Sequence, residues 1–334
     1  MQSERAGHGK IAPNLFDKLL HVRSILFWVI GLLGFLAVIL VVLHLGSLER
    51  MVKLARSARP AWLLLVQAST YLSAALVWRQ ALCHAGHPLP MRALVPLGIA
   101  KVFTDQVLPS GGISGTMLVV RGLIRRRVPS KIAMAAMLAG LVSYDVAYMI
   151  IVLTSAGILW LHNRANLPIF IGVGVFAVIT IAIPTAVLSA KRWGDRKPMT
   201  WVSKLLGMTD LLRALTEAPT HLLRSPALLI QTVVLQLGIF ILDALTLWLV
   251  FNAIGEVPEI WVIFVSFAIA SMVATIGPIP VGLGTFEATS VGMLHLLGVS
   301  VEAALAGTLL LRGLTFWLPM LPGIWLARRE IGRL

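Results

Sequence analysis

The sequence predicts an all-α polytopic membrane protein made of two inverted repeats, and three observations lead to this class. Hydrophobic residues make up 58% of the 334 residues and charged residues only 13%, with a mean hydropathy of +0.90, whereas soluble domains contain about 25% charged residues. Several apolar runs are long enough to cross a bilayer as helices. Two further apolar stretches break at a proline and a glycine cluster, and the two breaks lie about half a chain length apart.

The apolar runs define the expected full spans. A helix needs about 20 residues to cross a hydrocarbon core of about 30 Å, and the sequence contains six runs of this length. They are Ile25–Leu45, Ala61–Leu82, Ile132–Leu161, Leu167–Ser189, Ala227–Phe251 and Glu302–Ala327. The residues before the first run are polar. We therefore expect a cytoplasmic N-terminal segment over residues 1–24 and a single transmembrane domain over residues 25–334.

The two broken stretches share one pattern. The first reads Pro109-Ser-Gly-Gly-Ile-Ser-Gly-Thr116 and the second reads Pro278-Ile-Pro-Val-Gly-Leu-Gly-Thr285, so that the proline, the last glycine and the threonine fall at one offset. An internal duplication is the simplest explanation. Paired broken helices in corresponding halves of a membrane protein indicate a transport site. We interpret each stretch, residues 89–124 and 257–297, as two half-helices that form a re-entrant hairpin.

The loop charges predict the orientation. The chain has 28 Lys and Arg against 14 Asp and Glu, a net charge of +14. If the N-terminus is cytoplasmic and both hairpins are re-entrant, most basic loops face the cytoplasm, as the positive-inside rule requires. The exception is the loop from Arg50 to Arg59, which this topology places outside. The excess of basic residues then indicates contact with anionic lipid rather than with nucleic acid.

This topology makes the second repeat, residues 167–327, inverted relative to the first, residues 25–161. The two hairpins enter from opposite faces, their tips are expected to approach the midplane, and the C-terminus is cytoplasmic. Backbone that is not helical lies at membrane depth only where protein or a watery cavity surrounds it. Glycine and proline suit such tips because they permit tight turns and close helix contacts.

Charged residues inside the apolar stretches are the next candidates for function. An isolated charge at the centre of a membrane helix costs about 2.5–3.5 kcal/mol, so such residues are paired or functional. Lys101 and Asp105 are four residues apart and are expected to pair on one helix face. Glu287 and Arg312 form a second expected pair, buried in the membrane. Asp105, with Asp145 and Asp243, is a candidate for proton coupling.

The second break carries a resemblance to a known family. The string from Pro278 to Glu287 and the later Leu311-Arg312 resemble the lysylphosphatidylglycerol synthase transmembrane-region family, whose flippase-like domains occur fused to aminoacyl-lipid synthases and alone. The first break, followed by Arg121, is similar over the same register. The resemblance covers the chain from about residue 25. It implies a role in handling polar lipids, with Glu287 and Arg312 as the matching charged positions.

Together these features predict a substrate site at the hairpin tips. Helix N-termini after glycines direct partial positive charge at an anion, and two arginines add full charges. The expected ligand is the headgroup of a membrane phospholipid or another polar lipid. The candidate substrate-binding residues are Gly111, Gly112, Gly115, Thr116, Arg121, Gly282, Gly284, Thr285, Glu287 and Arg312.

Other chemistries are not supported by the sequence. It contains no GxxxxGK[ST] nucleotide-binding loop, and His84 and His87 are three residues apart without further metal ligands, so no cofactor or metal is expected. The aminoacyl-transfer domain would need hundreds of soluble residues, and we expect no enzymatic activity. The predicted function is transport of a polar or anionic lipid across the bacterial inner membrane.

Two alternatives remain open from the sequence. The chain is either a non-transporting subunit that positions a lipid- or glycan-modifying enzyme, with the basic stretch from Lys191 to Arg224 as a docking surface, or an ion-coupled carrier of a small anion. The first alternative implies a membrane enzyme as partner, and a homo-oligomer is compatible with each of the three functions.

Overall fold

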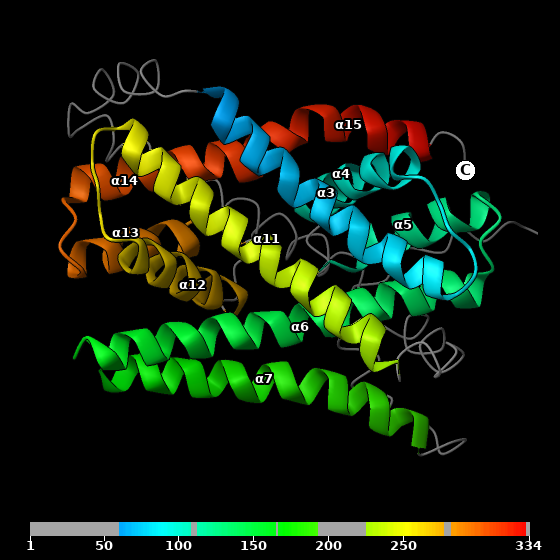
Figure 1. The fold of residues 1–334 in the computed structure, drawn as a ribbon, viewed down its shortest axis with the longest axis horizontal. Coiled ribbons are helices and arrows are strands. Elements are labelled where there is room, and N and C mark those ends of the chain that lie inside the picture. The colour runs from blue at the N-terminus through cyan, green and yellow to red at the C-terminus, as the bar shows by residue number, and fades with distance from the viewer. Residues whose placement is uncertain (1–59, 108–111, 165, 193–224, 277–281, 332–334) are drawn as a thin grey trace, which may run out of the picture.

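The structure, a computed structural model, describes residues 60–107, 112–164, 166–192, 225–276 and 282–331. Within these segments the regular elements are helices, and no strand occurs among them (Figure 1). The predicted all-α class is therefore confirmed for the described part of the chain. The predictions for the N-terminal segment, the run from Ile25 to Leu45, the loop from Arg50 to Arg59, Gly111 and most of the basic stretch before Ser225 concern residues outside this part.

The helices fall into two groups along the chain, separated by residues 193–224. The first group is α3 (Pro60–His84), α4 (Met91–Val107), α5 (Ile113–Arg125), α6 (Ser130–Leu161) and α7 (Leu167–Arg192). The second group is α11 (Pro226–Ala253), α12 (Ile260–Ile276), α13 (Thr285–Leu296), α14 (Val301–Arg312) and α15 (Leu318–Ile331), with a π-helical turn, η2 (Gly313–Trp317), that joins α14 directly to α15.

Three helical stretches are long and apolar enough to cross a membrane. They are Ser130–Leu161, Pro226–Ala253 and Val301–Glu330, and they coincide with three of the expected spans. Helix α3 covers the expected run from Ala61 to Leu82, and shorter apolar stretches occur in α7 (Leu167–Ala182) and in α12. All five expected runs that the structure describes are thus helical, while six membrane crossings in total remain a prediction.

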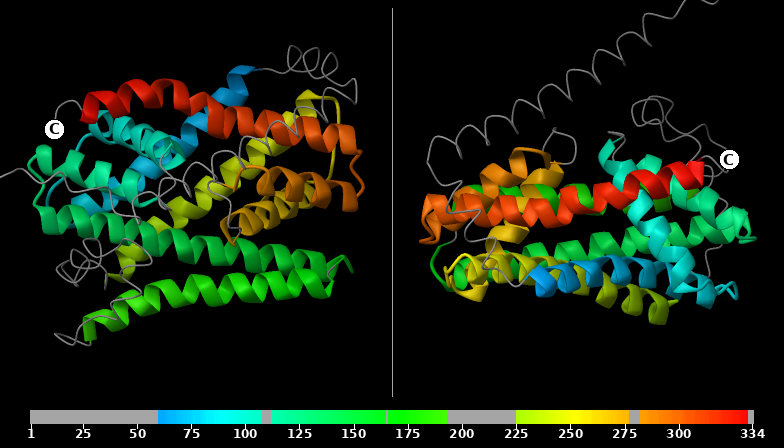
Figure 2. Two further views of the ribbon diagram at one scale, coloured as in Figure 1. Left: turned by 180° about the vertical axis from the view of Figure 1, so that it is seen from behind. Right: turned by 90° about the horizontal axis from the view of Figure 1, so that it is seen from above.

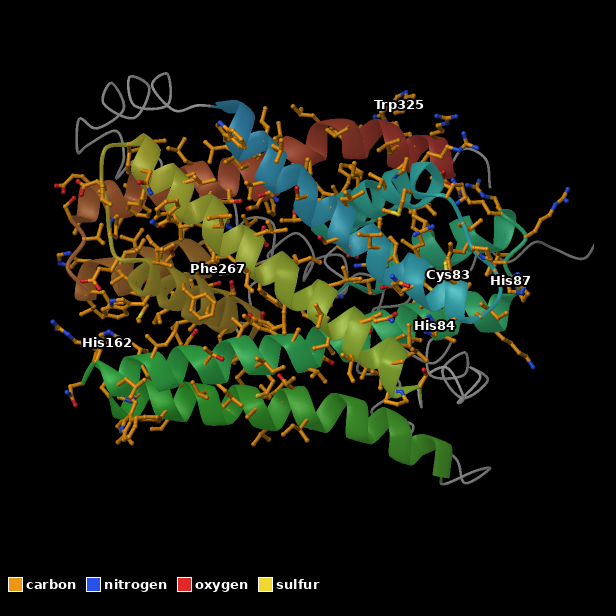
Figure 3. All side chains as sticks on the ribbon, viewed as in Figure 1. Cys83, His84, His87, His162, Phe267 and Trp325 are labelled. Carbon is orange, nitrogen blue, oxygen red and sulfur yellow. The ribbon has the colours of Figure 1, made fainter. Side chains whose placement is uncertain are left out.

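Each glycine-rich break separates two helices that pack against each other. Helix α4 contacts α5, and α12 contacts α13. The α4–α5 hairpin lies toward the end of the bundle that carries His84 and His87, whereas the α12–α13 hairpin lies toward the opposite end, near His162 (Figures 1 and 3). The two hairpins therefore lie toward opposite ends of the helix bundle, while their re-entrant insertion into the membrane remains a prediction.

The long helices hold the two hairpins in place. Helix α4 packs along α15, and α12 packs along α6, so each hairpin contacts a long helix of the other group. Helices α3 and α11, which precede the two hairpins, cross each other, and α6 and α7 run side by side (Figures 1 and 2). At Gly323 on α15 a Cβ atom would lie 2.5 Å from the Cβ atom of Phe103 on α4. Small residues permit such close helix contacts inside membranes, where packing drives association.

The buried apolar side chains form two clusters, one around each hairpin. One cluster joins α3, α4, α5 and the first half of α6 and includes Leu97, Val119 and Leu123. The other joins the second half of α6 with α7, α11, α12, α13 and α14 and includes Leu247 and Leu294. The protein core is therefore divided between the two ends of the bundle, and each hairpin is embedded in its own half.

Candidate functional site

The tip of the α12–α13 hairpin holds a buried ion pair. Glu287 is the third residue of α13, and Arg312 is the last residue of α14. Arg312 Nε donates a hydrogen bond to Glu287 Oε1 over 2.7 Å, and the two side chains are only 13% and 8% exposed. The structure thus confirms the pair that the sequence predicts. A buried pair of this kind cancels most of the cost that either charge would carry alone.

The same two side chains fix the glycine turn that precedes α13. Glu287 Oε2 accepts a hydrogen bond of 2.7 Å from the backbone N–H of Gly284, as in one half of a capping box. Arg312 Nη2 donates to the carbonyl oxygen of Gly282 over 3.2 Å. Both glycines have positive φ angles, +64° at Gly282 and +83° at Gly284, a conformation that other residues rarely adopt. The ion pair and the turn therefore depend on each other.

Further contacts attach α13 to α14 around this pair. The guanidinium group of Arg312 lies 4.5 Å from the ring centre of Phe286 and 5.4 Å from that of Phe316, within the range of cation–π attraction. About one helical turn away from the pair, the hydroxyl groups of Ser290 and Thr308 are 2.9 Å apart and fully buried. These contacts hold the Arg312 side chain in place, with its guanidinium group directed toward the glycine turn before α13.

The tip of the α4–α5 hairpin repeats this arrangement with different residues. Lys101 Nζ lies 2.5 Å from Asp105 Oδ2, which confirms the expected pair within α4. Asp105 Oδ1 accepts a hydrogen bond of 2.9 Å from the backbone N–H of Gly115 at the start of α5, and Thr116 Oγ1 donates to the carbonyl oxygen of Gly112 over 2.8 Å. A Cβ atom at Gly115 would lie 2.3 Å from Asp105 Oδ1, so a side chain there would displace the carboxylate.

The two tips share one arrangement, in which a carboxylate accepts a hydrogen bond from a backbone N–H group near the start of the second half-helix. Asp105 does this for Gly115, and Glu287 does it for Gly284. The cation differs: Lys101 comes from the same helix as its partner and the pair is partly exposed, whereas Arg312 comes from another helix and its pair is buried. The second tip is the more strongly fixed of the two.

A comparison with known protein families identifies the family of this chain. The family described as the lysylphosphatidylglycerol synthase TM region matches residues 28–323, which is most of the chain. The chain belongs to this family. A comparison with curated proteins gave no match. Family membership confirms the resemblance seen in the second hairpin and, with the apolar helices, identifies a membrane protein whose family is tied to lipid handling.

Three of the candidate residues, Arg121, Asp145 and Asp243, lie outside the two hairpin tips. Arg121 is exposed on the outer part of α5, and Asp145 is half-buried on α6. Asp243 lies on α11 beside the side-chain amide of Gln67 on α3. Gly111 lies outside the described residues. The structure thus gathers the second set of candidates (Gly282, Gly284, Thr285, Glu287 and Arg312) at one tip and the first set (Gly112, Gly115, Thr116 and Asp105) at the other.

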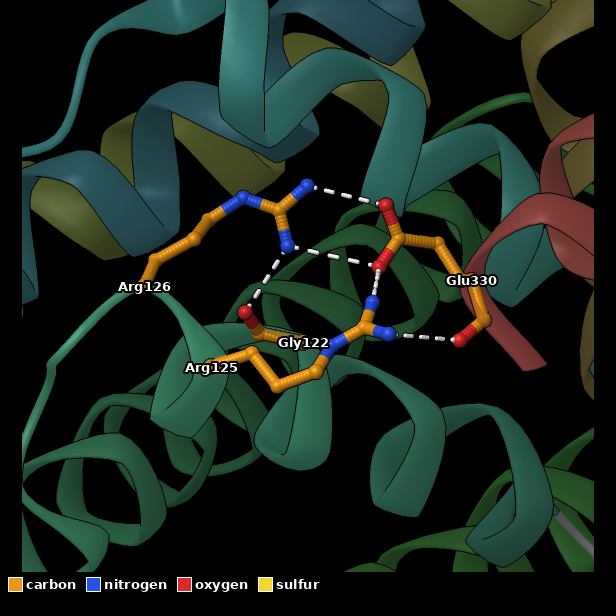
Figure 4. A network of polar contacts seen from close by, with 4 residues as sticks. All are labelled: Gly122, Arg125, Arg126 and Glu330. Atoms are coloured by element: carbon orange, nitrogen blue, oxygen red, sulfur yellow. Dashed lines mark hydrogen bonds and ion pairs between the residues drawn. The ribbon is translucent and has the colours of Figure 1, made fainter. Parts of the chain in front are cut away.

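The structure also contains a charged cluster at the end of the bundle that was not predicted from the sequence. Glu330 on α15 accepts hydrogen bonds from Arg125 and Arg126 at the end of α5 (Figure 4). Arg126 Nη2 lies 2.9 Å from Glu330 Oε1, and Arg125 Nη1 donates to the backbone carbonyl oxygen of Glu330 over 3.0 Å. Arg126 also donates to the carbonyl oxygen of Gly122. This cluster, here called the α5–α15 clamp, ties the first hairpin to the last helix. A lone acidic residue after Arg328 and Arg329 was its only signal in the sequence.

The described residues give no sign of a metal centre. Within the described segments no group of three or more His, Cys, Asp or Glu side chains is close enough to hold a metal ion. His84 on α3 is exposed, and its Nδ1 atom contacts the carbonyl oxygen of Gln80 within the same helix. The expectation of no metal or cofactor remains a prediction.

Proposed function

We propose that this protein moves a polar or anionic lipid across the bacterial inner membrane, with the headgroup passing between the two hairpins and the acyl chains in the surrounding lipid. The observation that carries the proposal is the buried Glu287–Arg312 pair at the tip of a broken helix. A lipid phosphate offers a guanidinium group the same planar set of acceptor oxygens as a carboxylate. A headgroup phosphate can thus pair with Arg312 as Glu287 does, and the displaced Glu287 carboxylate must then take up a proton or another partner.

The order of the helices supports an inverted duplication. In each group a long helix precedes a hairpin and a long helix follows it: α3, α4–α5 and α6 in the first group, and α11, α12–α13 and α14–α15 in the second. The hairpins lie at opposite ends of the bundle (Figure 1). Transporters with inverted repeats expose a central site to each side in turn by rocking one repeat against the other. In this protein such rocking would move the two tips relative to each other.

The charges at the two ends of the bundle support an orientation. The turn after α5 and the end of α15 at the α4–α5 end carry Arg125, Arg126 and Arg127, and Arg328 and Arg329. The loops at the other end contain Glu256, Glu259 and Glu302, with Arg164. The positive-inside rule then places the α4–α5 end in the cytoplasm. The C-terminus, which follows α15, is cytoplasmic in this proposal.

Thr285 and the N-terminus of α13 complete the proposed headgroup site. The hydroxyl oxygen of Thr285 is buried and has no hydrogen-bond partner among the described residues. It stands at the first position of α13, where the helix dipole favours negative charge. A phosphate oxygen near Arg312 would provide an acceptor for this hydroxyl group. The first tip, with Gly112, Gly115 and Thr116, would offer the headgroup a second position on the cytoplasmic half of its path.

Lipid translocation in proteoliposomes tests the proposal. Purified full-length protein is reconstituted with a trace of fluorescent phosphatidylglycerol, and a membrane-impermeant reductant reports how fast the label reaches the outer leaflet. Arg312→Gln and Arg312→Lys are compared with Arg328→Gln, which changes an exposed arginine of α15, and each variant is first checked for folding. We expect a large loss of rate in the two Arg312 variants and the wild-type rate in the control.

Three results would count against the proposal. Wild-type rates in both Arg312→Gln and Glu287→Gln would remove the site assignment. No translocation by the wild-type protein, together with co-purification of one membrane enzyme in a fixed ratio, would replace transport by the role of a positioning subunit. Transport of a soluble phosphate ester instead of the labelled lipid would favour the small-anion carrier.

A further inference from the structure

A second buried polar cluster lies where α3 crosses α11. Gln67 and Thr70 on α3 are 3% and 4% exposed, and Tyr71 follows them on the same helix. Asp243 on α11 lies beside the Gln67 amide and is the only ionisable residue between Pro226 and Ala253. These side chains, here called the α3–α11 cluster, lie where the two helices pack against each other. A carboxylate in such a position is expensive unless its charge is compensated.

The hydrogen atoms of the cluster are all engaged. The Gln67 amide donates to Thr70 Oγ1 over 3.0 Å and reaches Tyr71 Oη at 3.5 Å, while it also faces Asp243. Thr70 Oγ1 donates to the carbonyl oxygen of Gln67 over 2.7 Å. Tyr71 Oη donates to the carbonyl oxygen of Thr315 over 3.4 Å. Each hydroxyl group and the amide have thus used the hydrogens that they carry.

Two acceptor oxygens remain without a partner. Gln67 Oε1 and Asp243 Oδ1 are both buried, and neither accepts a hydrogen bond from a described residue. A buried acceptor that has lost water and gained no donor costs free energy, and the cost is larger for a charged group. The cluster therefore lacks a hydrogen-bond donor or a positive charge beside these two oxygens, which belong to neighbouring side chains.

The surrounding helices do not supply that charge. The charge of Asp243 acts on Tyr71 from α3 and on Tyr144 from α6, which has Asp145 beside it, and neither tyrosine can supply a positive charge. Helix α12 contains no ionisable residue. Helix α14 contains two, Glu302 in its first turn and Arg312, which is paired with Glu287. No cation from these helices is thus assigned to Asp243 within the described residues.

We infer that the α3–α11 cluster binds one monovalent cation, a proton or Na⁺, between Asp243 and Gln67. A proton would convert one carboxylate oxygen of Asp243 into a donor that can bond Gln67 Oε1. A sodium ion would instead use the two oxygens, with neighbouring hydroxyl and carbonyl oxygens, as ligands, as in transporters that bind Na⁺ near broken helices. In both cases the ligand neutralises Asp243 and satisfies the two acceptors.

The position of the cluster connects this cation to the headgroup site. Thr315, which accepts the hydrogen bond of Tyr71, belongs to the π-helical turn η2 that directly follows Arg312. Phe316 of the same turn contacts the Arg312 guanidinium group. Turns of π-helix are frequent at functional sites. This step rests on the proposed function: if Arg312 binds a headgroup, the cation at Asp243 is positioned to bias that binding and to couple transport to an ion gradient.

The cation is tested on purified full-length protein without any transport assay. Infrared difference spectra between acidic and alkaline buffer report the C=O band of a protonated carboxylic acid. Thermal unfolding in NaCl is compared with choline chloride at equal ionic strength. The variant Asp243→Asn supplies an amide donor of nearly the same shape, and Asp145→Asn is the control because it removes another carboxylate of the membrane region.

A bound proton predicts a carboxylic-acid band at neutral pH in the wild type and in Asp145→Asn, and its loss in Asp243→Asn. A bound sodium ion predicts an unfolding temperature that rises with Na⁺ but not with choline, an effect lost in Asp243→Asn and weakened in Gln67→Leu. Wild-type protein that shows neither signal overturns the inference without the need for any variant. Because neither readout requires transport, a cation site in a protein that moves no lipid would contradict only the proposed function.

Discussion

Arg312 Nε lies 2.7 Å from Glu287 Oε1, and this ion pair joins the end of α14 to the first turn of α13. The remaining bonds of the two side chains reach the backbone of Gly282 and Gly284, where the chain has positive φ angles. One pair of charges thus fixes the glycine turn from Gly282 to Gly284. A ligand that takes Arg312 away from Glu287 would also release the turn, which links ligand binding to movement of the hairpin.

Removing one partner of this pair is expected to destabilise the protein more than removing both. Glu287→Gln leaves the Arg312 charge buried without a carboxylate, for which we expect a loss of about 3–5 kcal/mol in the free energy of unfolding. The double variant Glu287→Gln with Arg312→Met has no uncompensated charge and is expected to recover much of this loss. Chemical unfolding in detergent measures the two values.

Glu302→Gln provides the control for that experiment. Glu302 is an exposed carboxylate in the first turn of α14, and its loss is expected to cost less than about 1 kcal/mol, the size of a helix-dipole interaction. If the Glu287→Gln variant and the double variant are equally stable, the buried Arg312 charge does not depend on Glu287 for its compensation.

The two glycines of the second tip are expected to differ in their response to alanine. Gly282 and Gly284 both have positive φ angles, so alanine costs about 1–3 kcal/mol at either position. At Gly282 the new Cβ atom would also lie 2.5 Å from the Cβ atom of Ala274 on α12, whereas at Gly284 no atom lies within 4 Å. Gly282→Ala should therefore reduce the free energy of unfolding more than Gly284→Ala does. The difference is the cost of overpacking, about 1–3 kcal/mol, and a lower unfolding temperature of Gly282→Ala reports it.

Gly284→Asn sharpens this comparison, because asparagine tolerates a left-handed conformation better than alanine. It is expected to be milder than Gly284→Ala. Equal effects of alanine at the two glycines would indicate that α12 moves aside at Ala274 and that the close contact does not define the tip.

Much of this architecture could be predicted from the sequence, because membrane helices follow directly from apolar run length. The breaks at Pro109 and Pro278 predicted the ends of α4 and α12 to within a few residues, and the rarity of membrane charges was enough to pair Glu287 with Arg312. Asp243 was a predicted candidate for proton coupling, but its contact with Gln67 in the α3–α11 cluster was not predicted. Gln67 and Asp243 come from α3 and α11, helices that are far apart in the sequence, and no local pattern indicates that they meet.

The π-helical turn after Arg312 was likewise absent from the prediction. Residues 302–327 form one continuous apolar run, and the composition of Gly313–Trp317 does not distinguish an α-helical from a π-helical turn. Glu330 was overlooked for another reason. Its partners, Arg125 and Arg126, belong to a basic run whose ordinary explanation is contact with lipid, and only the packing of α5 near α15 reveals the clamp.

The α5–α15 clamp is expected to depend mainly on Glu330. This carboxylate is 8% exposed and accepts from two arginines that are about one-quarter exposed, at 27% and 25%. In Glu330→Gln the two arginines face each other without a counter-charge, and we expect a loss of about 1.5–3 kcal/mol, the range for hydrogen bonds to charged groups. Arg126→Gln alone should cost less, because Arg125 still neutralises the carboxylate.

Thermal unfolding at low and high salt measures the clamp. Arg329→Gln is the matched control, since Arg329 is exposed on the same helix and its guanidinium group lies over the ring of Trp325, whereas the ion-pair partners of Glu330 are Arg125 and Arg126. Little change in Glu330→Gln, or the same change in Arg329→Gln, would show that α5 and α15 are held together by their apolar contacts instead.

The last prediction concerns which end of the bundle faces the cytoplasm. Arg127 is exposed in the turn between α5 and α6, and Glu256 is exposed after α11, at the opposite end. If the positive-inside rule sets the orientation, a membrane-impermeant thiol reagent added to intact cells should label Glu256→Cys and not Arg127→Cys, with Cys83 replaced by serine in both. Labelling of both positions after the membrane is opened shows that each thiol is accessible. The reverse pattern would put the α12–α13 hairpin on the cytoplasmic side, and the headgroup that Arg312 is proposed to bind would then be taken up from the inner leaflet first.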